Sequence, residues 1–64
     1  HEVLIEMQSK KNENEWMGRN EQNIKVIFPK ENFNMGQFVK VMIDRSTTTS
    51  LIGRGISLVK KEFN

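Results

Sequence analysis

The side chains of this 64-residue sequence that could do chemistry are cations and aromatic rings rather than nucleophiles or metal ligands. Cysteine is absent and the single histidine is the first residue, so a thiolate nucleophile, a cysteine zinc site and an iron–sulfur cluster cannot be built from it. The sequence contains neither a glycine loop ending in Lys-Ser or Lys-Thr nor a Ser-His-Asp set. We therefore expect no catalytic residue and no metal site within this chain.

Seven cations stand at turns or at outward strand positions, where they can reach an anionic partner. They are Lys10, Lys11, Arg19, Lys25, Lys40, Arg45 and Arg54. Ammonium and guanidinium groups contact phosphate oxygens, and an arginine can bind a phosphate or a base edge through two donors. The competing interpretation is ordinary solvation of loop and strand lysines. For Arg19 the alternative is an ion pair with Glu15 or Glu21.

Phe38 is the aromatic residue most suited to an exposed ring. Its neighbours Val39, Val41 and Ile43 alternate toward the core, which turns Phe38 to the other face. A base stacked on such a ring contributes roughly 1–3 kcal/mol. The alternative for Phe38 is packing beneath a connecting segment. The remaining aromatic residues are expected in the core or at its ends: Trp16, Phe28, Phe33 and Phe63.

Short β-strands must position these side chains, because apolar and polar residues alternate between polar or glycine-containing stretches. The predicted strands cover residues 2–7, 16–19, 24–28, 37–44 and 51–59. In the first strand, alternation places Val3, Ile5 and Met7 on one face. In the connector before the fourth strand, Phe33 and Met35 are expected to plug one end of the core.

Five short strands favour a closed arrangement, because closure removes the edges that a flat sheet would leave open. Glycines at residues 53 and 55 permit a bend in the last strand. We therefore predict an all-β fold, a small five-stranded antiparallel β-barrel. An OB-like and an SH3-like barrel share this strand count, and the strand pattern leaves both open.

Size and charge limit the remaining possibilities. Sixty-four residues form one domain, spanning 1–64. Residues 1–32 carry five basic and six acidic side chains, a net charge of −1, whereas residues 33–64 carry five and two, a net charge of +3. This distribution is compatible with a polyanionic partner. Neither a run of about 18 apolar residues nor a signal peptide is recognisable, so we expect a soluble, cytoplasmic protein without a membrane partner.

Several short motifs, taken in order, resemble a TRAM domain nearly from end to end. They are Val3-Leu4-Ile5-Glu6, Ser9-Lys10-Lys11, Gly18-Arg19-Asn20, Asn23, Val26, Phe28-Pro29, Gly36-Gln37-Phe38-Val39, Val41, Ile43, Ser50-Leu51 and Gly53. No single motif is specific, but their order and spacing are. The resemblance is strongest to the C-terminal TRAM domain of MiaB-type tRNA methylthiotransferases, and it implies the OB-like form of the barrel.

The sequence departs from that pattern at a few positions. Met7 replaces a usual glycine, Asn20 replaces a usual threonine, and residues 44–46 and Arg54 also differ. Methylthiotransferases that act on a ribosomal protein carry a TRAM domain too, but their turn usually reads differently from residues 18–23. The resemblance therefore favours the tRNA branch, with the ribosomal-protein branch as the alternative.

The resemblance implies a parent enzyme that is a radical S-adenosylmethionine protein with iron–sulfur clusters and that methylthiolates an isopentenylated adenosine beside the tRNA anticodon. No cofactor is expected in this chain. It implies that this chain binds the anticodon stem-loop of tRNA and lies beside the catalytic domain of the same parent chain. The eight candidate residues would make the RNA contacts. An alternative function is interdomain packing without direct RNA contact.

Overall fold

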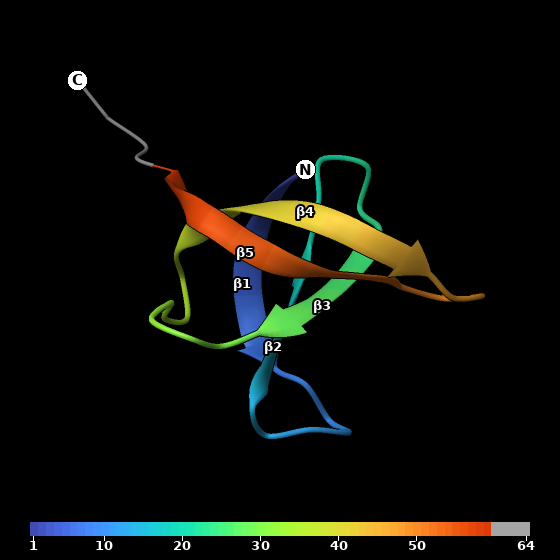
Figure 1. The fold of residues 1–64 in the computed structure, drawn as a ribbon, viewed down its shortest axis with the longest axis horizontal. Coiled ribbons are helices and arrows are strands. Elements are labelled where there is room, and N and C mark those ends of the chain that lie inside the picture. Colours follow the sequence, from blue (N-terminus) through green and yellow to red (C-terminus); the bar gives the residue numbers. More distant parts are fainter. Residues whose placement is uncertain (60–64) are drawn as a thin grey trace.

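The computed structural model describes residues 1–59, which form five β-strands joined by turns and loops (Figure 1). The strands are β1 (Glu2–Gln8), β2 (Glu15–Arg19), β3 (Lys25–Pro29), β4 (Phe38–Ser46) and β5 (Leu51–Val59). Each predicted strand is confirmed to within one or two residues at either end. Within residues 1–59 there is no helix of the length and apolarity needed to cross a membrane.

The strands close into a barrel in the order β1-β2-β3-β5-β4, with β4 pairing back onto β1. Four of the five strand pairs are antiparallel, but β3 and β5 run parallel. The predicted small five-stranded barrel is confirmed, and one of its five strand pairs departs from the predicted antiparallel arrangement. The reason is geometric: strand directions can alternate around a closed ring only if the number of strands is even. The placement of β5 between β3 and β4 is the Greek-key arrangement of an OB-like barrel.

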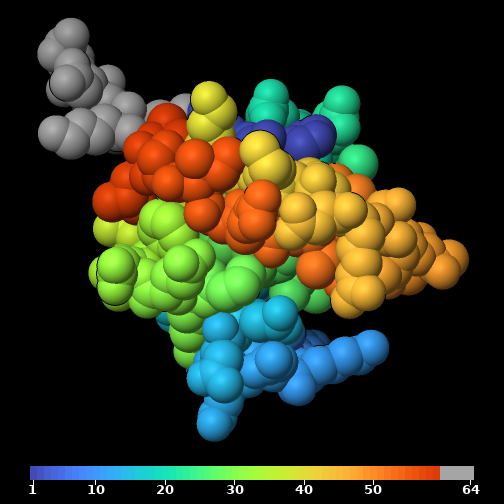
Figure 2. All heavy atoms as spheres, in the orientation of Figure 1, coloured from blue at the N-terminus to red at the C-terminus, as the bar shows by residue number. Residues whose placement is uncertain are grey.

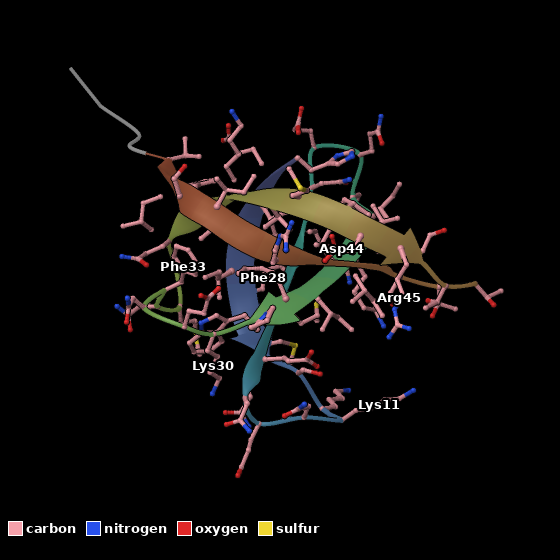
Figure 3. All side chains as sticks on the ribbon, in the orientation of Figure 1. Lys11, Phe28, Lys30, Phe33, Asp44 and Arg45 are labelled. Carbon is pink, nitrogen blue, oxygen red and sulfur yellow. The ribbon has the colours of Figure 1, made fainter. Side chains whose placement is uncertain are left out.

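The core is built from β-branched and aromatic side chains, and its fully buried members point inward from three strands, β1, β3 and β4. Its buried members are Val3, Ile5, Val26, Phe28, Val39 and Val41, and Trp16, Phe33, Ile43 and Leu51 pack against them. The predicted inward face of β4 is confirmed. Phe28 and Phe33 meet edge to face at 6.2 Å between ring centroids (Figure 3).

Met7 does not share the inward face of Val3 and Ile5, as alternation predicted. The β1–β2 register shifts between Ile5 and Met7, where a β-bulge adds one residue to β1. The bulge turns Met7 outward, opposite Met17, and leaves it 37% exposed.

Met35 also differs from its predicted role as a core plug. It lies at the corner of a turn in which the backbone amide of Gln37 donates to the carbonyl of Asn34, and it is 58% exposed. Gly36 follows with a φ of 88°, a left-handed conformation that glycine adopts without cost. Phe33 does plug the core as predicted, and its carbonyl accepts a hydrogen bond from Trp16 Nε1 at 2.9 Å.

Candidate nucleic-acid interface

The outer face of β2 and β3 carries two cross-strand pairs of opposite character. Met17 lies opposite Ile27, and Arg19 lies opposite Lys25. Between them Gly18 faces inward, where a Cβ atom would collide with the backbone carbonyl oxygen of Leu4. Glycine at this position therefore lets β1 approach β2 closely and fixes which β2 side chains point outward.

The β1–β2 loop, residues 9–14, presents two lysines beside this face. Its base is closed by the Ser9 amide, which donates to the Glu15 carbonyl at 2.9 Å. Ser9 is buried and anchors the loop, whereas Lys10 and Lys11 at its start are exposed. Their ammonium groups are thus free to approach a ligand without loss of core packing.

The β4–β5 loop, residues 47–50, lies beside the same face and is held by a hydroxyl group. Thr47 Oγ1 accepts a hydrogen bond from the Ser50 amide at 3.0 Å, and the Thr47 amide donates to the Ser50 carbonyl at 2.7 Å. Ser50 is buried and Thr49 is exposed. In Figure 2 the two loops project at the lower and right-hand edges of the molecule, and the surface recedes between them.

Between the loops lies an open groove of about 410 Å³, which we call the β2–β3 groove. Its lining residues are Met7, Ser9, Lys10, Lys11, Met17, Arg19, Lys25, Ile27, Thr49 and Ser50. Among the described residues, every charged side chain that lines the groove is basic. Half of the eight sequence-predicted residues therefore meet here, drawn from three separate segments of the chain.

Arg45 lies next to the β2–β3 groove rather than in it. It lines an adjoining hollow with Ile52 and Glu15, and this hollow shares Lys11 and Ile27 with the groove. Figure 3 shows Lys11 and Arg45 on the same side of the barrel. Arg45 can therefore extend the positive surface beyond the β4–β5 loop.

Phe38 is half-buried and lies in a different hollow. The lining of that hollow includes Glu2, Glu6 and Glu21 together with Arg19. The ring therefore stands in acidic surroundings, which disfavour the approach of a phosphate.

Lys40 and Arg54 line neither the groove nor the adjoining hollow. Lys40 lies opposite Glu2 on β1 and Ser57 on β5. Arg54 lies opposite Met42, with its Nη2 3.7 Å from the Met42 sulfur. Arg54 is therefore not among the candidate residues that meet at the groove. Lys25 and Lys40 lie on strands that are not neighbours, because β5 separates β3 from β4.

Arg19 has a partner other than the two predicted glutamates. Its Nε lies 3.6 Å from Glu6 Oε1, and its Nη1 donates to Asn23 Oδ1 at 3.3 Å. Asn20, one of the departures from the TRAM pattern, organises this turn. Its side-chain oxygen accepts hydrogen bonds from the amides of Gln22 and Ile24, both at 3.0 Å.

Sequence reasoning missed the apolar part of the groove. Met17, Ile27 and Ile52 are half-buried side chains on its floor and in the adjoining hollow. The signal was present in the alternation of β2 and β3, since Met17 and Ile27 occupy the same outward phase as Arg19 and Lys25. Among residues 1–59 the structure contains no group of three or more side chains able to ligate a metal ion.

Comparison with known proteins agrees with this architecture. The family model described as the TRAM domain matches residues 1–56. The chain is 53% identical over 57 residues to a tRNA-2-methylthio-N(6)-dimethylallyladenosine synthase of Christiangramia forsetii and 49% identical over 57 residues to one of Flavobacterium johnsoniae. A protein of the same name from Chloroherpeton thalassium is 46% identical over 56 residues.

These alignments cover 88–89% of the chain but only 12% of each relative. The similarity therefore concerns one small domain of much longer proteins. Because the family model spans almost the whole of the barrel, the chain belongs to the TRAM domain family.

Proposed function

We propose that this chain is an RNA-binding module and that the β2–β3 groove is its contact surface. The observation that supports this proposal is the meeting of Lys10, Lys11, Arg19 and Lys25 around one groove whose described lining includes no carboxylate. Cations gathered in this way bind phosphates and release counterions, which is the main source of affinity for nucleic acids. The strand 2–3 face and the two flanking loops are also where OB-folds bind oligonucleotides.

The parent protein that we propose is a tRNA methylthiotransferase. The relatives bear the name tRNA-2-methylthio-N(6)-dimethylallyladenosine synthase, and this name favours the tRNA branch over the ribosomal-protein branch. The iron–sulfur clusters and S-adenosylmethionine that the family resemblance implies do not fit this chain, which has no cysteine. In our proposal they belong to another part of the parent, and this chain holds the anticodon stem-loop near that part.

Exposed apolar side chains on β4 and β5 form a second surface that could pack against the rest of the parent chain. Met42, Ile56 and Leu58 on β4 and β5 are each about half exposed, at 48%, 53% and 50%. None of them lines the β2–β3 groove. Interdomain packing through β4 and β5 is thus compatible with RNA binding at the groove.

The proposal is tested by titrating the isotopically labelled chain with an anticodon stem-loop and following the amide resonances. Lys10→Gln and Lys11→Gln together should lower the affinity about ten-fold at low salt, because two phosphate contacts are lost. Lys40→Gln and Arg54→Gln remove the same charge outside the groove and are the matched control. Equal losses in both double variants would mean that net charge, not the groove, determines binding.

A further inference from the structure

A row of apolar side chains crosses the outer face of four strands, along the floor of the β2–β3 groove and into the adjoining hollow. Met7 on β1 lies opposite Met17 on β2, Met17 lies opposite Ile27 on β3, and Ile27 is in parallel register with Ile52 on β5. We call these four residues the apolar row. Three strand spacings separate its ends, a span of about 14 Å.

The β-bulge in β1 is what completes the apolar row. Without the bulge between Ile5 and Met7, simple alternation would turn Met7 into the core with Val3 and Ile5. Met7 is instead exposed, and Met17, Ile27 and Ile52 are half-buried, so all four present apolar atoms to solvent. Core packing does not explain this outward placement.

Cations border the apolar row on both sides. Arg19 and Lys25 form the next outward pair along β2 and β3, about 7 Å from Met17 and Ile27. On the other side, the β1–β2 loop brings Lys10 and Lys11 to the same groove. The arrangement is an apolar floor between two positive rims.

Among residues 1–59, no aromatic side chain lines the groove. Trp16, Phe28 and Phe33 pack in or against the core, and Phe38 lies in the acidic hollow. The floor therefore offers thioether and branched alkyl groups. These groups pack against the flat face of a base without selecting its hydrogen-bonding edge.

We propose that the apolar row holds unpaired nucleotides, with bases lying on Met17, Ile27 and neighbouring row residues and phosphates bound by the cations of the two rims. This inference rests on the proposed RNA-binding function and specifies its ligand as single-stranded RNA. A duplex hides its base faces in the stack and can offer the groove only its backbone. An unpaired segment offers both phosphates and base faces.

The four methionines provide the test in the unaltered protein, because Met7 and Met17 belong to the apolar row whereas Met35 and Met42 do not. The chain is labelled at its methionine methyl groups and titrated with a single-stranded RNA and with an RNA duplex of equal phosphate count. We expect the single strand to shift the Met7 and Met17 methyl resonances upfield, through the ring currents of bases, and the duplex to leave them in place. Met35 and Met42 should not move with either.

Substitution gives a second measurement. Met17→Gln with Ile27→Thr should weaken single-strand binding about three- to ten-fold and change duplex binding less than two-fold. Met42→Gln with Ile56→Thr makes the same changes outside the groove and should leave both affinities as they are. Amide spectra of the free variants verify that each one is folded.

The results separate this inference from the proposed function. If Lys10→Gln and Lys11→Gln weaken both forms of RNA while the row methyls and row variants respond to neither, the groove binds RNA by charge alone and the inference is overturned. If neither the lysine variants nor the row variants change binding, the proposed function itself is wrong, and the row is covered by something other than RNA.

Discussion

Arg19 already contacts two other side chains in the free protein. Its guanidinium group lies 3.6 Å from the Glu6 carboxylate and donates to the Asn23 side chain. Both charged side chains of the pair are more than 40% exposed, and ion pairs exposed to this degree contribute little to stability. A phosphate can therefore replace Glu6 at Arg19 with little loss to the fold, and Glu6 acts as an internal competitor.

Replacing this competitor should strengthen RNA binding. Glu6→Gln removes one negative charge near the groove and releases Arg19, so we expect the affinity for RNA to rise about two- to five-fold at low salt. Fluorescence anisotropy with a labelled oligonucleotide measures the change. Glu31→Gln alters the net charge equally, outside the lining of the groove. An equal gain in that variant would contradict a specific role for Glu6.

At the scale of elements, the β4–β5 loop depends on one hydroxyl group. Thr47 Oγ1 accepts from the amide of Ser50, a buried residue that immediately precedes β5. The loop leads from β4 into β5 next to Arg45 and forms one wall of the groove. Its conformation therefore affects both the stability of the barrel and the shape of the binding surface.

Removing that hydroxyl should destabilise the protein measurably. Thr47→Val keeps the side-chain shape but leaves the Ser50 amide without its acceptor, which costs about 1 kcal/mol in the free energy of unfolding. Urea denaturation followed by circular dichroism gives this value. Thr47→Ser retains the acceptor and should stay within about 0.5 kcal/mol of the original protein. If the valine variant is as stable as the serine variant, the hydroxyl is not holding the loop.

The strands themselves were predictable from the sequence because alternation is a local property. The errors occurred where a feature other than alternation decided the direction of a side chain. The outward turn of Met7 depends on a bulge that exists only in the pairing of β1 with β2. The exposure of Met35 depends on a turn stabilised by Gln37, which also caps the Asn34 amide through its side-chain oxygen.

The candidate site was predictable in part, for a related reason. Lys10, Lys11, Arg19 and Lys25 could be identified as available cations, but whether they meet is decided by which strands are neighbours. Because the sequence does not show which strands are neighbours, Arg54 was grouped with these cations, although it lies on another part of the barrel surface. Apolar residues such as Met17 and Ile27 were overlooked because an apolar side chain in a strand is usually assigned to the core.

At the scale of the whole molecule, a net charge of +2 permits RNA binding only if the positive charges are concentrated. The fold does this by bringing two loops and the β2–β3 face to one side of the barrel (Figure 1). The β1–β4 side instead carries mixed charges, with Lys40 opposite Glu2. Attraction to RNA should thus be directional despite the low overall charge.

The dependence of affinity on salt should report the size of this concentrated surface. Four phosphate contacts predict a slope of about −3 for log K against log salt concentration with single-stranded RNA. Lys10→Gln and Lys11→Gln should reduce its magnitude by about 1.4. Anisotropy titrations over a range of salt concentrations provide the slope. A slope near zero would contradict phosphate binding, and an unchanged slope in the double variant would exclude these two lysines from it.

The odd number of strands has one more consequence. It requires at least one parallel strand pair, which here is the seam between β3 and β5. The registered residue pairs of this seam are Val26 with Leu51 and Ile27 with Ile52. The second pair lies in the apolar row, so a ligand lying along the row would contact β3 and β5 at the same time. Ligand occupancy and closure of the barrel would then be thermodynamically linked, each favouring the other by the same free energy. The strand pair with the fewest registered residues would then be the one that its ligand stabilises.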